Sequence, residues 1–263
     1  MNYSFNKKHA IVCGSTDGIG KATAFELAAN GCDITLVSRS ANKLEKTFTE
    51  LPKQNREQEH SYLKADFNNA NSLKSKINNY INKLDKPVHI LVNNSGGPRG
   101  GNILQAELDE FRQAFEGLLI ANQIISQAVA PIMKRNRYGK IINIISTSVK
   151  QVIPGLGVSN TIRGSVAQWS KTLAMELGPH QISVNNVLPG YTTTKRLNEL
   201  ADDKAFRENT TPDEIKRNWE NNTILKRLAS PEEIANVIVF LCSDKSSYIT
   251  GQNISVDGGK IGV

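Results

Sequence analysis

The stretch HAIVCGSTDGIGKA, residues 9–22, decides the fold. Its first part, HAIVCG, has the apolar character of a strand that is buried on both faces of a sheet. Gly14, Gly18 and Gly20 follow with G-x3-G-x-G spacing. Glycines allow a tight turn from a strand into a helix and a close approach of the backbone to a pyrophosphate, which the helix N-terminus attracts. The stretch therefore predicts a dinucleotide-binding loop at the start of a βαβ unit.

Strands and helices alternate along the rest of the chain. Further strands are predicted from short apolar runs at 33–38, 61–66, 88–93, 140–146, 182–188 and 253–257. Helices are predicted at 18–30, 41–51, 70–84, 107–134 and 158–178, and another begins at the capping sequence Ser230, Pro231 and Glu233. This alternation predicts an α/β fold with a doubly wound parallel sheet. We expect one domain over 1–263, with 191–229 as a flap on the substrate side.

The composition argues against several other classes of protein. The net charge of +7 is dispersed, without a block of about five like charges, so we expect no nucleic-acid partner. No run approaches the ~20 apolar residues of a membrane span, and the polar segment 1–9 does not read as a signal peptide. The 3 cysteines form no CxxC pair and the 4 histidines are scattered. We therefore expect reduced thiols, no metal site, no membrane contact and a cytoplasmic protein.

The end of the second predicted strand indicates the type of cofactor. An NAD-binding protein usually has an acidic residue there, which binds the ribose hydroxyls. This chain has Ser38 and Arg39, a hydroxyl and a guanidinium that suit a 2′-phosphate. Asp17 in the glycine loop counts against a nearby phosphate, because its carboxylate would repel it. On balance the sequence favours NADP over NAD.

Five further motifs occur in order along the chain. They are AD at 65–66, NNSG at 93–96, IINIIS ending at Ser146, LPG at 188–190 followed by Thr194, and YITGQNISVDGG at 248–259. With the glycine loop, these motifs resemble the short-chain dehydrogenase/reductase family, most closely its 3-oxoacyl-[acyl-carrier-protein] reductase-like members. The resemblance implies a single Rossmann domain with a seven-stranded parallel sheet in the order 3-2-1-4-5-6-7, a small-molecule carbonyl substrate, and a homo-oligomer, either a dimer or a tetramer.

The same resemblance assigns four catalytic positions, which the family fills with serine, tyrosine, lysine and asparagine. Ser146 occupies the serine position. The flanking segment 164–178 places the tyrosine position at Ser159, 13 residues after Ser146, and the lysine position at Arg163. The flank of the preceding helix places the asparagine position at Leu118. SNTIR therefore stands where the family has YxxxK, which resembles a divergent subgroup of the family with SN-x-x-R at this place.

These replacements change the chemistry that is expected. A lysine can bring the pKa of a tyrosine toward neutrality, but a serine hydroxyl cannot reach that range, so Ser159 is a poor general acid. Arg163 keeps a positive charge that can bind ribose hydroxyls, but it does not release its proton. Leu118 supplies no polar group for a proton relay, and Asn122, one turn further along the helix, is the nearest substitute.

The segment PGYTTTKR, 189–196, contains Tyr191 and Lys195 at the YxxxK spacing. It follows the sixth predicted strand, whereas the family motif lies on the helix after the fifth. The sequence therefore favours a coincidence of spacing. Tyr191 stays open as a proton donor, because the PG segment lies beside the nicotinamide in the family.

Two functions remain open at this stage. The first is an NADP-dependent oxidoreductase, a carbonyl or ketoacyl reductase, whose proton-transfer site is atypical and impaired. The second is a catalytically inactive dinucleotide-binding protein, and a weaker third is a partner in an assembly. Arg99 and Arg163 favour an anionic substrate.

The predicted site residues fall into two groups. The catalytic candidates are Ser146, Ser159, Arg163 and Tyr191. The cofactor-binding candidates are Gly14, Ser15, Thr16, Gly18, Ile19, Gly20, Ser38, Arg39, Asp66, Phe67, Asn93, Ser95, Gly96, Arg163, Pro189, Gly190, Thr192 and Thr194.

Overall fold

The computed structural model, described over residues 3–261, contains a parallel sheet of seven strands. The strands are β1 His9–Cys13, β2 Asp33–Ser38, β3 Ser61–Lys64, β4 Ile90–Asn93, β5 Gly139–Ile144, β6 Ile182–Pro189 and β7 Asn253–Val256. Their order is β3-β2-β1-β4-β5-β6-β7, which confirms the doubly wound fold and the order implied by the resemblance. The order reverses between β1 and β4, and ligands of such sheets bind beyond the carboxyl ends of the strands at that point.

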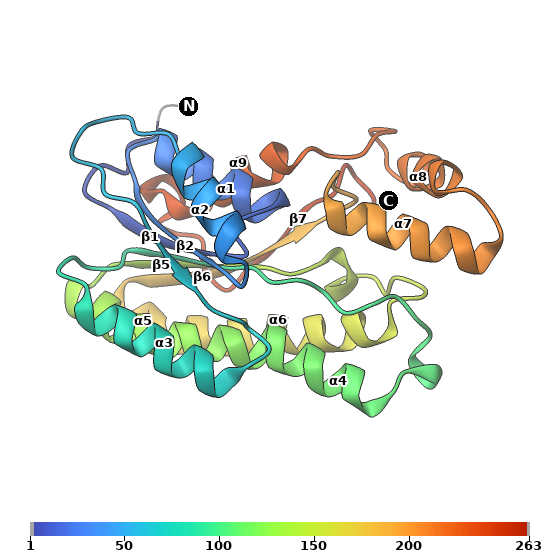
Figure 1. The fold of residues 1–263 in the computed structure, drawn as a ribbon, viewed down its shortest axis with the longest axis horizontal. Coiled ribbons are helices and arrows are strands. Elements are labelled where there is room, and N and C mark those ends of the chain that lie inside the picture. The colour runs from blue at the N-terminus through green and yellow to red at the C-terminus, as the bar shows by residue number, and fades with distance from the viewer. Residues whose placement is uncertain (1–2, 262–263) are drawn as a thin grey trace.

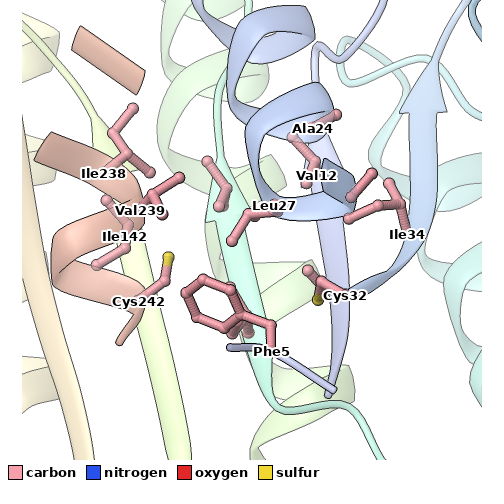
Figure 2. Close-up of a cluster of buried hydrophobic side chains, with 14 of the residues drawn as sticks. Phe5, Val12, Ala24, Leu27, Cys32, Ile34, Ile142, Ile238, Val239 and Cys242 are labelled. Carbon is pink, nitrogen blue, oxygen red and sulfur yellow. The ribbon is translucent and has the colours of Figure 1, made fainter. Parts of the chain in front are cut away.

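Helices cover both faces of the sheet, as Figure 1 shows. On one face lie α1 Gly18–Ala29, α2 Ala41–Glu50 and α9 Pro231–Cys242, and on the other lie α3 Ala70–Lys83, α5 Ala121–Asn136 and α6 Gly157–Leu177. Alternate residues of β1 enter the two layers: Val12 joins the α1–α9 core drawn in Figure 2, and Ile11 joins the α3–α5 core. Burial on both faces explains why the strands are continuous apolar runs.

Four 3-10 turns lie between the helices and strands, and two local features of the sequence can be compared with the structure. The 3-10 turns are η1 Ile103–Gln105, η3 Thr147–Val149, η4 Gly178–His180 and η5 Asp244–Ser246. The predicted cap of α9 is confirmed, because Ser230 and Glu233 form a reciprocal capping box with Pro231 at the first turn. The three cysteines are free and buried, as expected. Among residues 3–261, no helix is both long and apolar enough to cross a membrane.

The helix predicted over 107–134 is interrupted in its middle. It consists of α4 Leu108–Phe115, a π-helical turn η2 Glu116–Ile120, and α5. The wider turn shifts the backbone, and the Ser95 hydroxyl donates a hydrogen bond to the Gly117 carbonyl at 2.9 Å. A Cβ on Gly117 would collide with the side-chain oxygen of Asn68. Amphipathic patterning did not predict this turn, because the apolar residues continue through it.

The segment predicted as a flap, 191–229, contains two helices that the weak sequence pattern did not reveal. They are α7 Lys195–Glu208 and α8 Pro212–Asn221, and Figure 1 shows them beyond the end of β7. Thr194 and Thr211 cap their N-termini through side-chain oxygens. The helices share a small apolar cluster that includes Leu197, Ile215 and Trp219. Most of their surface faces solvent, which is why the apolar pattern is thin.

A row of asparagine side chains joins the carboxyl-end halves of β4, β5 and β6 to the first residue of β7. Asn93, Asn143, Asn186 and Asn253 are paired in register across β4, β5, β6 and β7. Each amide group donates to the next side-chain oxygen, at 2.9, 3.0 and 2.7 Å. These side chains hold together the strands whose ends carry the candidate site.

Candidate active site

The glycine loop has the geometry that a pyrophosphate requires. Gly14 and Gly18 have positive φ angles of 57° and 49°, a conformation that other residues adopt only with strain. A Cβ on Gly20 would collide with the Gly14 carbonyl oxygen. The loop leads into the N-terminus of α1, where the N–H groups and the helix dipole attract an anion. The residues present therefore fit the pyrophosphate of a dinucleotide.

The segment after β6 packs directly against this loop. A Cβ on Gly18 would lie 2.9 Å from the Thr194 methyl group, so the two parts of the chain are in contact. Gly190 is also confined, since a Cβ there would lie 2.6 Å from the Asp257 Cα atom. Thr194 is the N-cap of α7, and its hydroxyl accepts from Leu197 N at 3.2 Å. The predicted residues of the two segments therefore meet at one place.

The predicted 2′-phosphate site lies at the end of β2. The hydroxyl groups of Thr16 and Ser38 are 3.1 Å apart, and Arg39 is exposed beside them. Asp17, which counted against a phosphate, has its carboxylate 3.9 Å from the ammonium group of Lys43. Lys43 offsets this negative charge and adds a cation that sequence patterns did not single out.

The remaining cofactor candidates differ in how accessible their side chains are. Gly96 and Asp66 are exposed. The side chains of Ile19, Phe67 and Pro189 are partly buried. Several polar groups are occupied inside the protein: the hydroxyls of Ser15, Ser95 and Thr192 hydrogen-bond to backbone carbonyls, and Asn93 binds Asn143 within the sheet. Because their donor hydrogens are used inside the protein, these four side chains can only accept hydrogen bonds from a cofactor, and any donated bond would come from backbone atoms.

Two of the four catalytic candidates, Ser146 and Arg163, meet at the end of β5, and a third, Ser159, lies one helical turn from Arg163 on α6. Ser146 follows the strand, and its hydroxyl accepts from Ser148 N at 3.0 Å. Ser159 and Arg163 are four residues apart on α6 and so lie on one helix face. Arg163 Nη1 donates to the carbonyls of Ile144 and Ile145, at 3.3 and 2.9 Å, directly before Ser146. Arg163 therefore links the helix to the strand end that carries Ser146.

The charge of Arg163 is shaped by its surroundings. Burial, and to a smaller extent the positive charge of Arg196, together lower the pKa of its guanidinium to about 10. The group stays protonated at neutral pH. Arg196 was not among the predicted site residues, because its position depends on how α7 folds back over the loop after β4.

A small cavity lies behind Arg163. Leu118, Asn122, Asn94 and Ser95 contribute to its wall, and its space is enough for about one water molecule. Leu118, at the position that the family resemblance assigns to asparagine, is buried with 5% exposure. Asn122 borders the same cavity, as its place one turn further along suggested. The side-chain oxygen of Asn93 is buried and has no hydrogen-bond partner within residues 3–261.

Tyr191 belongs to the flap rather than to the group around Ser146. Its ring stacks on Trp219, with centroids 5.1 Å apart and an interplanar angle of 12°, and the Lys260 ammonium lies 4.3 Å from its centroid. Burial raises the pKa of Tyr191, the opposite of what a proton donor needs at neutral pH. Lys195 is 68% exposed and lies 3.9 Å from Glu199. Tyr191 and Lys195 therefore lack the arrangement of a working pair.

Known proteins resemble the whole chain. A family model described as enoyl-(acyl carrier protein) reductase matches residues 14–260. The 3-oxoacyl-[acyl-carrier-protein] reductase FabG of Aquifex aeolicus is 31% identical over 98% of this chain and 99% of its own length. The NADPH-dependent reductase BacG of Bacillus subtilis is 27% identical over 97% of this chain and 98% of its own length.

A solved structure extends the comparison to three dimensions. The L-sorbose reductase of Gluconobacter frateurii, crystallised with NADPH and L-sorbose, superposes with a TM-score of 0.91 at 27% identity and covers 100% of both chains. The match includes the glycine loop, the seven-stranded sheet and the segment after β6. The chain therefore belongs to the short-chain dehydrogenase/reductase family.

Proposed function

We propose that this protein is an NADP-dependent reductase of small carbonyl compounds whose proton does not come from a tyrosine. The observation that carries the proposal is the contact between Gly18 and Thr194, which joins a pyrophosphate loop to the segment after β6, the strand that pairs with β5 before Ser146. Arg39 and Lys43 supply positive charge for a 2′-phosphate. BacG is described as NADPH-dependent, and L-sorbose reductase was crystallised with NADPH.

Each residue around Ser146 has a defined task in this proposal. NADPH supplies a hydride for the carbonyl carbon. The Ser146 hydroxyl accepts from Ser148 N, so its own proton is free to point at the substrate oxygen. Arg163 places a fixed positive charge beside it, which favours negative charge on that oxygen as the hydride arrives.

The proton has a path that avoids a tyrosine. Ser159 lies one turn before Arg163, and the cavity lined by Asn122 has room for a relay water. A hydroxyl and water pass protons without an acidic group of matched pKa, so this path is slow. The absence of a tuned general acid costs about 10²–10⁴-fold in rate. We therefore expect a slow reductase.

The alternative is a dinucleotide-binding protein without turnover. The burial of Leu118 and the serine at position 159 favour it, because they remove two groups of the proton relay that the family resemblance implies. A cytoplasmic location and a homo-oligomeric assembly remain predictions from the sequence.

The two functions separate in a pair of measurements. Calorimetry with NADPH and NADH measures cofactor binding, and loss of NADPH absorbance measures turnover of a panel of ketones, keto acids and enones. Tight NADPH binding with slow oxidation, abolished by Ser146→Ala, supports the reductase. Binding without turnover of any carbonyl compound supports the inactive protein, and a lack of affinity for both coenzymes contradicts both functions.

A further inference from the structure

Two arginine side chains from different elements converge above Gly97. Arg163 comes from α6 and Arg196 from the first turn of α7. A Cβ built on Gly97 would lie 3.3 Å from Arg163 Nη2 and 3.9 Å from Arg196 Nη2. Both guanidinium groups therefore reach the same small volume, and the lack of a side chain on Gly97 keeps that volume open.

The positive charge at this place is only partly balanced by the protein. Among the residues described, no carboxylate forms an ion pair with Arg163. Arg196 has Glu199 Oε2 at 3.8 Å, but that carboxylate is half exposed and also lies 3.9 Å from Lys195. Two neighbouring cations that are partly removed from water repel each other, so the pair is costly unless an anion joins it.

Backbone contacts hold both groups in place. Arg163 Nη1 donates hydrogen bonds to the carbonyls of Ile144 and Ile145, and Nη2 faces Gly97. Arg196 Nη2 donates to the carbonyl oxygen of Pro98, which ties α7 to the loop after β4. A rigid guanidinium pair loses little conformational entropy when it binds a planar anion.

The phosphates of the cofactor have other partners. The glycine loop accounts for the pyrophosphate, and the 2′-phosphate site lies at the end of β2, three strands away from β5 in the sheet. The arginine pair lies instead beside the strand end that carries Ser146, where the reacting carbonyl is expected. Because Glu199 already balances part of the charge of Arg196, the two arginines have about one positive charge left to pair. That charge suits a monoanion better than a doubly charged phosphate.

We propose that Arg163 and Arg196 bind a carboxylate of the substrate, so that the protein reduces keto acids in preference to neutral ketones. This inference rests on the proposed function. The carboxylate sits between the guanidinium groups while the keto oxygen faces Ser146. The keto acid, NADPH and one proton give the hydroxy acid and NADP⁺, and the carboxylate itself is unchanged.

Binding without turnover tests the inference first. Pyruvate, acetoacetate and levulinate, each beside its neutral methyl ester, are titrated into the protein loaded with NADP⁺, which has no hydride to give. At least one acid should bind about tenfold or more tightly than its ester. Arg196→Gln should remove this preference without changing the affinity for NADPH by more than about twofold. Equal binding of every acid and its ester overturns the inference.

Matched variants separate a local effect from a general one. Arg135→Gln removes one exposed positive charge at the end of α5 and should leave the preference intact. Gly97→Ala should weaken acid binding, because its methyl group occupies the space between the guanidinium groups. Gly164→Ala is its control, since a Cβ there meets nothing within 4 Å. A parallel loss of acid and NADPH affinity in Arg196→Gln assigns Arg196 to the cofactor and overturns the inference.

Turnover distinguishes this inference from the proposed function. Reduction of neutral ketones with no preference for keto acids overturns the carboxylate site and leaves the reductase in place. Acid binding that depends on Arg196, without turnover of any carbonyl compound, overturns the reductase and keeps the anion site. Arg196→Lys, which retains the charge but not the fork of donors, should recover part of the preference.

Discussion

The glycine loop after β1 and the strand end after β5 lie at the same edge of the sheet, and in the proposed function they are two halves of one site that serve the cofactor and the carbonyl, respectively. The loop half consists of backbone geometry: positive φ angles at Gly14 and Gly18, and a close approach at Gly20. The strand half consists of side chains, and only Ser146 matches the residue that the family resemblance expects there. Side chains can change with little effect on the backbone, so a cofactor site and its chemistry can diverge separately.

The largest effect is expected in the strand half. Ser146→Ala should lower turnover by about 10²–10³-fold, because it removes the hydroxyl that is proposed to polarise the substrate oxygen. The affinity for NADPH should stay within about twofold of the original value. Steady-state kinetics and calorimetry on the same protein provide the two readouts. An equal loss of turnover and of NADPH affinity would mean that the glycine loop and the strand end after β5 do not act separately.

The next effect is expected in the loop half. Gly20→Ala forces a methyl group against the Gly14 carbonyl, and the overpacking should weaken NADPH binding by about tenfold to a hundredfold. Gly164→Ala is the matched control and should bind normally. Calorimetry measures binding, and circular dichroism checks that the fold is retained. Unchanged affinity in Gly20→Ala would contradict the placement of the pyrophosphate.

A smaller effect is expected at the end of β2. Arg39→Gln should weaken NADPH binding by about tenfold and leave NADH binding nearly unchanged, since only the first carries a 2′-phosphate. The ratio of the two dissociation constants is the measurement. If both affinities fall together, Arg39 acts on the loop and not on the phosphate.

The smallest effect is expected from the flap tyrosine. Tyr191→Phe keeps the stacking on Trp219 and should change turnover by less than about twofold. A thermal melt should show only a minor change for the same reason. A loss of tenfold or more in turnover would instead indicate that Tyr191 is the proton donor and that the segment 191–229 contributes to the reaction.

The parts of the molecule that the sequence predicts are those whose structure depends on neighbouring residues in the chain. Buried strands give apolar runs, glycine turns follow from spacing, and the cap at Ser230 is a local pattern, so the sheet and the loop were accessible from the sequence. The π-helical turn at 116–120 was not, because a continuous apolar run, 118–120, passes through it and hides the shift in helical phase. Arg196 also escaped prediction, since its contact with the 97–98 segment arises only when the flap folds over it.

The asparagine row across β4–β7 has a direction as well as a register. The amide nitrogens of Asn93, Asn143 and Asn186 donate toward β7, so each of these side chains is oriented by its neighbour, and one cannot turn over unless the others do. The first member, Asn93, is thereby left with its oxygen unshared, and Asn93 also borders the cavity behind Arg163. The orientation of this side chain beside the cavity is thus set from β7, three strands away in the sheet, and its oxygen is left to accept a hydrogen bond from a donor.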